Sequence, residues 1–188
     1  WNRFGPMFAA ELRKKRADRM REHTHWRWHL DEVYVKINGE MHYLWRAVDQ
    51  EGEVLESYVT KTRDKAAALS FMKKALKRHG PPEAIITDGL RSYKAAMDEL
   101  GNAGKQQIGR GANNRAENSH QPTRQRERAM KRFTSPGHAQ RFLSAFSGIS
   151  PHFRPRRHLL STADYRQVMA GRFAVWNEIT GATTTAAD

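Results

Sequence analysis

The pair Asn38-Gly39, placed between two apolar stretches, constrains the fold of this chain more than any other feature. Residues 26–37 and 41–49 are rich in Trp, Tyr, Val and Ile, which are residue types favoured in β-strands. Asn-Gly between two such stretches is the strongest short signal for a hairpin. Glu51-Gly52 predicts a second turn, leading into a third strand over residues 54–59. The first part of the chain is therefore predicted to be a three-stranded antiparallel meander.

After the meander the pattern changes to helices and short strands. The spacing of apolar residues predicts helices over 63–79, 92–100, 113–132, 136–149 and 162–179, and short strands over 85–86 and 105–109. A crossover helix after a meander returns the next strand parallel and right-handed beside the first strand. This order predicts an α/β fold of the ribonuclease-H-like type. It has a mixed five-stranded sheet, three antiparallel strands and then parallel ones, flanked by helices.

Three carboxylates stand at positions where a structural role alone would be costly. Asp31 lies inside an apolar strand, Asp88 ends the short strand at 85–86, and Glu117 opens a basic helical stretch. Two hard divalent cations shared with a phosphodiester would compensate such charges. Taken singly, Asp31 could pair with a neighbouring Arg, Asp88 could cap a helix or form a turn, and Glu117 could form a surface ion pair. Asp49 and Asp64 suit turn or capping roles better than a metal site.

The balance of charge predicts a polyanionic partner. The chain has 33 Lys and Arg against 20 Asp and Glu, a formal net charge of +13 and a pI near 10.4. Nucleic acid is the first candidate because each phosphate contact releases counterions. The densest basic run adjoins Glu117, and we predict that it contacts DNA phosphates through Arg115, Arg124, Arg126, Arg128, Lys131 and Arg132. Such contacts position DNA without reading its sequence.

Composition also argues against two other classes of protein. No apolar run approaches the ~20 residues of a membrane-spanning helix. The chain has no cysteine, which leaves no disulfide framework and no Cys-ligated zinc. Together with the absence of a visible signal peptide, this predicts a cytoplasmic, nucleoid-associated protein without a membrane partner.

The motifs around the three acids resemble those of bacterial DDE transposases, and more narrowly those of the insertion-sequence "six" family. The resemblance rests on the run Trp28-His29-Leu30-Asp31-Glu32-Val33-Tyr34-Val35-Lys36, on Thr87-Asp88, and on Asn113-Asn114-Arg115-Ala116-Glu117-Asn118-Ser119-His120. Matches at Tyr43–Asp49, Arg63-Asp64 and Arg126–Phe133 continue it from Trp1 to about Leu160.

This resemblance implies an activity and its machinery. Asp31, Asp88 and Glu117 match the three acids that hold two Mg²⁺ ions in that family, with Mn²⁺ as a substitute. The implied reaction is metal-dependent cleavage at the ends of a DNA element and strand transfer into target DNA, so the implied partner is double-stranded DNA. A homodimer or larger assembly on DNA is expected, since both element ends are handled together. Arg124, seven residues after Glu117, matches a basic residue that touches DNA near the cut.

The expected organisation has three parts. Residues 1–24 are expected to form a basic helical linker from an N-terminal DNA-binding module that lies outside this chain. Residues 25–160 are expected to form the catalytic domain, and residues 161–188 a helix and a disordered tail. Two alternatives to a transposase stay open: another ribonuclease-H-like nuclease or integrase, and a non-catalytic DNA-binding remnant.

Overall fold

The computed structural model describes residues 4–22, 25–109, 113–130, 132–155 and 159–181. Lys131, one of the predicted DNA-contact residues, and the predicted tail at 182–188 lie outside these ranges. In chain order the elements are α1 (Phe4–Arg21), β1 (Arg27–Ile37), β2 (Glu40–Asp49), β3 (Val54–Thr60), α2 (Lys65–His79), β4 (Ala84–Thr87), α3 (Arg91–Glu99), η1 (Ala103–Lys105), β5 (Gln106–Ile108), α4 (Asn114–Ala129), α5 (Pro136–His152) and α6 (Thr162–Thr180).

The five strands form one mixed sheet in the order β3-β2-β1-β4-β5. The β1–β2 hairpin turns at Asn38 and Gly39, whose φ angles of 47° and 86° are both positive, as a tight two-residue hairpin turn requires. β1 pairs antiparallel with β2, and β2 with β3. β4 returns parallel to β1, and β5 lies parallel to β4. The predicted meander and the predicted parallel return are both confirmed.

The connections that position β4 follow from local chemistry. Asp64 caps the start of α2, where its carboxylate accepts a hydrogen bond from the Ala67 amide at 2.9 Å. Gly80, with a φ of 76°, ends that helix in a conformation that glycine adopts most readily. Asp49 turns the chain between β2 and β3 by accepting from the amides of Glu51 and Glu53, at 2.8 and 3.1 Å. The predicted capping and turn roles of the two aspartates are confirmed.

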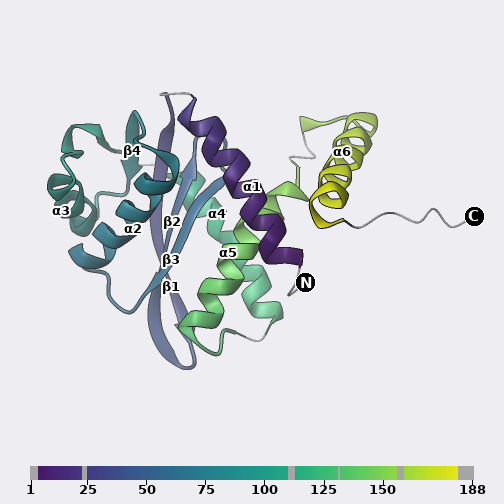
Figure 1. Ribbon diagram of the computed structural model, residues 1–188. Helices are drawn as coiled ribbons and strands as arrows, with labels where there is room; N and C mark the ends of the chain where they lie inside the picture. Colours follow the sequence, from purple (N-terminus) through teal and green to yellow (C-terminus); the bar gives the residue numbers. More distant parts are fainter. Residues whose placement is uncertain (1–3, 23–24, 110–112, 131, 156–158, 182–188) are drawn as a thin grey trace, which may run out of the picture.

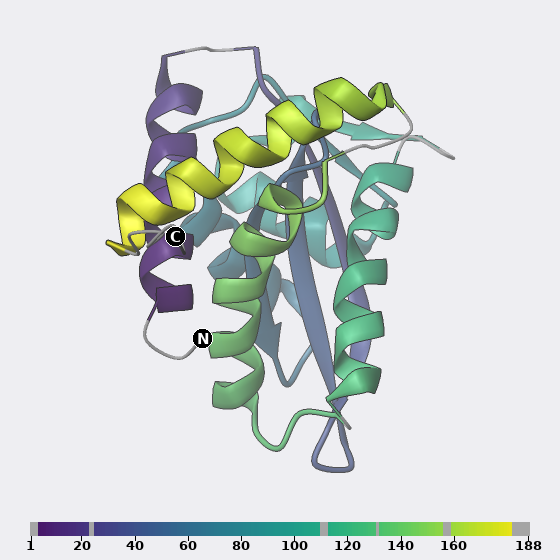
Figure 2. The same ribbon diagram turned by 90° about the vertical axis from the view of Figure 1, so that its right-hand side faces the viewer.

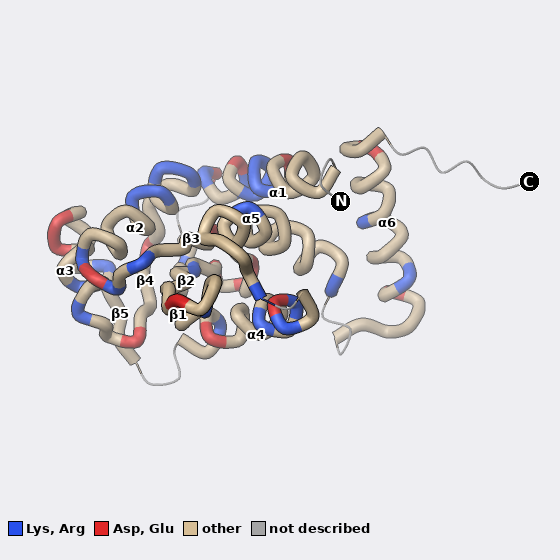
Figure 3. Tube along the Cα trace, turned by 90° about the horizontal axis from the view of Figure 1, so that it is seen from below, with Lys and Arg blue, Asp and Glu red and all other residues tan. Residues whose placement is uncertain are grey.

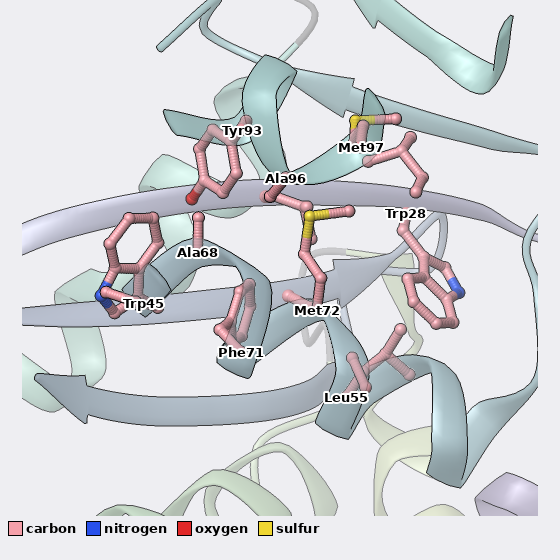
Figure 4. Close-up of a cluster of buried hydrophobic side chains, with 14 of the residues drawn as sticks. Trp28, Trp45, Leu55, Ala68, Phe71, Met72, Tyr93, Ala96 and Met97 are labelled. Carbon is pink, nitrogen blue, oxygen red and sulfur yellow. The ribbon is translucent and has the colours of Figure 1, made fainter. Parts of the chain in front are cut away.

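Helices cover both faces of the sheet (Figure 1). On one face, α2 and α3 pack on Trp28, Trp45 and Leu55 through a core that includes Phe71 and Met97 (Figure 4). Trp28 and Trp45 are almost fully buried.

On the other face, α5 packs on β3, and its Leu143 belongs to a buried cluster that includes Val35 and Leu44. Helix α4 lies beside α5 (Figure 2). Helix α1 packs against α5 and α6 through a small third cluster around Phe8 and Ile149. Within the described residues, no helix is both long enough and apolar enough to span a membrane.

His79 gives the fold a sensitivity to acid. Its ring is buried at the end of α2, where Nε2–H donates to the Leu55 carbonyl at 3.1 Å, and burial lowers its pKa to about 4. Between pH 6.5 and 4 the unfolded chain therefore binds a proton that the folded chain does not bind. The free energy of unfolding must then fall as the pH falls, by up to about 3 kcal/mol from this group.

We expect His79→Gln, which keeps a donor for Leu55, to flatten this part of the pH dependence. Urea unfolding of both proteins at pH 7 and pH 4.5 measures the difference. Equal losses of stability in the two proteins on acidification would exclude a role for His79.

Candidate active site

Asp31 and Asp88 come from neighbouring parallel strands. Pairing between β1 and β4 ends at His29 and Ile86, so Asp31 lies two residues beyond the paired segment of β1 and Asp88 two residues beyond that of β4. The structure brings their carboxylates together with that of Glu32. Each of the three offers an oxygen, and these oxygens lie within 4.8 Å of one another.

Glu32 was not among the residues that the sequence predicted for the site. Alternation along a strand places Asp31 on the face covered by α4 and Glu32 on the face covered by α2 and α3. Because β4 pairs with β1 only as far as His29, the edge of β1 beyond it is open, and both side chains can approach Asp88 there. The only signal in the sequence was that Glu32 directly follows Asp31 in the motif.

The surroundings of Glu32 leave one of its oxygens without a partner. Its Oε1 accepts from Arg63 Nε at 2.8 Å and forms an ion pair with that guanidinium. Its Oε2 is buried and has no hydrogen-bond partner. Burial raises the pKa of Glu32, Arg63 opposes the rise and Asp88 adds to it. Burial and the Glu32 carboxylate together raise the pKa of the neighbouring Tyr93 hydroxyl.

Asp31 faces two buried basic side chains. Arg46 stands opposite it in the β1–β2 pairing, and burial lowers the pKa of Arg46 to about 10 while Asp31 opposes that shift. His120 Nε2 lies 3.4 Å from Asp31 Oδ2. Burial lowers the pKa of His120 to about 4, although Asp31 opposes this. His120 is therefore neutral at pH 7 and does not balance the charge of Asp31.

Helix α4 crosses the sheet directly above Asp31. The amide Nδ2 of Asn113, just before the helix, donates to the Leu30 carbonyl at 2.7 Å, and the helix buries Ala116, His120 and Thr123. Glu117 lies in the first turn, where it is exposed, and it is not a member of the 4.8 Å group. At about 100° per residue it lies beside the buried face of the helix rather than on it.

Three neighbouring carboxylates repel one another, and a hard divalent cation bound between them would offset this repulsion. Such ions take oxygen ligands, mostly from Asp and Glu. The Oε2 of Glu32 is buried without a hydrogen-bond partner, and Asp88 adds to the rise that burial causes in the pKa of Glu32. Arg63 meets only one oxygen of Glu32. Asp31, Glu32 and Asp88 therefore have the donor set of a Mg²⁺ or Mn²⁺ site.

The predicted DNA-contact arginines line the solvent side of α4 and the residues after it. Arg115, Arg124, Arg126, Arg128 and Arg132 are all exposed, and the Lys and Arg positions of α4 are blue along the Cα trace in Figure 3. The helix is continuous through Pro122. Arg124, two turns beyond Glu117, therefore lies within about 20° of it around the helix axis.

Comparison with known proteins identifies the family. The sequence model of the DDE domain matches residues 25–156, more than half of the chain. The chain belongs to the DDE domain family. The resemblance to transposases of the insertion-sequence "six" family, predicted from the motifs, is thereby confirmed.

The curated relatives of this DDE domain chain include transposases. It is 40% identical over 77 residues to the transposase for insertion sequence-like element IS431mec of Staphylococcus aureus, covering 41% of this chain and 34% of the relative. The same figures apply to the transposase for insertion sequence element IS257 in transposon Tn4003 from that organism. The match thus spans about a third of the length of these relatives.

Two solved structures share the fold. The HTLV-2 integrase catalytic core domain, solved in complex with magnesium, superposes with a TM-score of 0.51 at 14% identity, over 66% of this chain and 84% of that one. The simian T-cell lymphotropic virus intasome, in complex with PP2A regulatory subunit B56 gamma, gives 0.53 at 15% identity, over 87% and 56%. The predicted ribonuclease-H-like fold is confirmed.

Proposed function

We propose that this DDE domain catalyses metal-dependent cleavage at the ends of a DNA element and strand transfer of those ends into target DNA. The observation that carries the proposal is the meeting of Asp31, in the middle of β1, with Asp88, directly after the neighbouring parallel strand β4, in a chain that belongs to the DDE domain family. A group of carboxylates at such a position has no evident structural purpose and costs stability unless a cation balances it.

The metal site would be built on Asp31 and Asp88, with Glu117 completing it from α4. Two Mg²⁺ ions, when bound, supply activation of the attacking oxygen and stabilisation of the leaving oxygen in a phosphoryl transfer. Arg63 holds Glu32 in place through Oε1, and the neutral His120 beside Asp31 leaves Arg46 as the positive charge opposite that carboxylate. Arg46 holds α4 against the sheet through Thr123. This contact helps to fix the position of the first turn of α4, which carries Glu117.

Double-stranded DNA would lie along α4. The exposed Arg115, Arg124, Arg126 and Arg128 offer phosphate contacts that begin beside Glu117 and continue to the end of the helix. A dimer or larger assembly on DNA belongs to the same proposal, because two element ends must be joined together. Cleavage without joining would point instead to a nuclease of the same fold.

Binding of Mn²⁺ tests the metal site directly. We expect the chain to bind Mn²⁺, as followed by electron paramagnetic resonance of the free ion, and we expect Asp88→Asn to weaken binding at least about tenfold, because an amide is a poorer ligand than a carboxylate. Asp98→Asn, an exposed aspartate on α3, serves as the matched control and should bind like the wild type. Equal affinities for the wild type and Asp88→Asn would exclude the site.

A further inference from the structure

The space between α4 and α5 contains a large cavity. It measures about 780 Å³ and opens between the C-terminal half of α4, the first half of α5 and the start of α1. Its lining combines apolar and cationic side chains. We define it as the α4–α5 groove, lined by Arg126, Met130, Arg141, Phe142, Phe146 and Arg154. The two helices that flank it run side by side in Figure 2.

Stacked aromatic rings form one wall of this groove. The rings of Phe142 and Phe146 are 5.0 Å apart between centroids and inclined by only 18°. Phe142 in turn meets the buried ring of Phe133 at 5.5 Å, which anchors the pair to the core. Both Phe142 and Phe146 are only half-buried, so this rigid pair keeps part of its surface for a planar ligand.

Cationic groups surround the rings. Arg126, Arg141 and Arg154 line the groove and are exposed. Among the residues that the structure describes, no Asp or Glu lines it. Guanidinium groups are suited to phosphate because they bind it through two parallel hydrogen bonds and also stack on flat rings.

Smaller hollows continue the groove along α4. Phe146 also lines a small cavity with Thr123, and Arg154 lines a third with Arg115 in the first turn of α4. The depression therefore follows the α5 side of α4 from its C-terminal half to its first turn, whereas Glu117, about 200° from Arg115 around the helix axis, lies on the other side.

We propose that the α4–α5 groove binds a single strand of DNA, with one base unstacked from its neighbours and placed against Phe142 and Phe146. Arg126, Arg141 and Arg154 bind the phosphates on either side of that base. The proposal rests on the proposed function, since it supplies a place for a strand that has left the duplex at a cut end. Stacking on aromatic side chains beside a basic groove is the general way in which proteins hold single strands.

A nucleic acid fits this surface better than a protein partner does. If an apolar helix from a second copy filled the groove, it would cover the three arginines and offer no carboxylate to balance their charge. The groove also shares Arg126 with the exposed arginines of α4, so a strand bound along that helix can continue into it.

The experiment compares two labelled oligonucleotides of equal length, one of thymidines and one in which every base is missing. Fluorescence anisotropy gives both affinities, in EDTA so that no divalent ion takes part. We expect the wild type to bind the thymidine strand about tenfold more tightly, within the range for stacking on an aromatic side chain. Phe146→Leu should lose most of this ratio, whereas Phe146→Tyr, which keeps the ring, should retain it.

Matched variants separate the base contact from general effects. Arg128→Gln, on α4 outside the groove, should weaken both strands and leave the ratio unchanged. Phe173→Leu removes a ring of α6 that is 52% exposed and should change nothing. Thermal melts establish that each variant is folded, and Arg141→Gln, an exposed change, should weaken the binding of both strands whatever Phe146→Leu does to stability.

Three results would overturn the proposal: a wild-type ratio near one, equal ratios for Phe146→Leu and the wild type, or a dimer in light scattering that Phe146→Leu dissociates without any effect on DNA. The groove is tested in EDTA, so no bound metal takes part in the measurement. Failure of the groove proposal is therefore distinguishable from failure of the metal site, which the Mn²⁺ titration reports.

Discussion

Glu117→Gln is expected to lower the joining of a pre-cleaved DNA end by about 10³-fold or more, with duplex binding nearly intact. The amide keeps the shape of the side chain but loses the charge that a hard cation needs, and metal stabilisation of the leaving oxygen contributes several kcal/mol. DNA binding should change little because the substitution alters one charge in a chain of net charge +13. A gel assay of strand transfer in Mn²⁺, with duplex binding measured by anisotropy, gives both quantities.

Glu32→Gln is the matched variant, because Glu32 is a member of the 4.8 Å group and Glu117 is not. If α4 supplies the third carboxylate, Glu32→Gln should retain much of the joining activity and lose mainly stability, through its ion pair with Arg63. Retained joining in Glu117→Gln, with loss in Glu32→Gln, would show that the third acid lies on β1. This pair of variants thus decides which glutamate completes the site.

The meeting of Asp31 and Asp88 could be predicted from the sequence, because each step of the inference is local or topological. Asn38-Gly39 sets the β1–β2 turn, Gly80 ends α2, and a right-handed crossover leaves β4 beside β1. Only the pairing of β4 with β1 is long-range, and the handedness of crossovers determines it. The end of β4, followed by Asp88, then lies beside the middle of β1, which carries Asp31.

The contribution of Glu32 could not be predicted, because strand alternation places it on the opposite face from Asp31. Its approach to Asp88 depends on how early the pairing of β4 with β1 ends, and strand ends are the least certain part of a sequence-based prediction. The sequence placed Glu117 near the site through the resemblance and the order of elements. Its side chain orientation depends on the rotation of α4, which no local pattern determines.

The long-range contacts of Arg46 could not be predicted from the sequence either. An arginine within an apolar strand suggests a buried charge, but its partners lie far along the chain. Its guanidinium donates to the Ser119 carbonyl, to Thr123 Oγ1 at 2.8 Å and to Ser57 Oγ at 3.3 Å. Two of these partners are on α4, so a single side chain of β2 fastens that helix to the sheet. Nothing in the sequence near Arg46 indicates this attachment.

Arg46→Met should therefore destabilise the domain by about 3 kcal/mol or more. Methionine fills similar volume, but the Ser119 carbonyl and the Thr123 hydroxyl lose a buried donor, at about 1–3 kcal/mol each, and Asp31 loses the positive charge opposite it. Urea unfolding measures the loss. Hydrogen exchange should become faster in α4 first, because that helix loses its attachment. Arg166→Ala, an exposed arginine on α6, should stay within about 0.5 kcal/mol of the wild type.

A second substitution separates the two causes of this loss. In an Asp31→Asn background the charge opposite Arg46 is already absent, so Arg46→Met should cost less there than in the wild type, and the difference is the coupling energy between the two residues. The cost that remains belongs to the hydrogen bonds that hold α4. An equal cost in both backgrounds would mean that Arg46 acts only as the clamp of α4 and does not balance Asp31. Asp31 would then depend on a bound cation for its compensation, so Mn²⁺ should raise the unfolding midpoint of the wild type and of Arg46→Met alike.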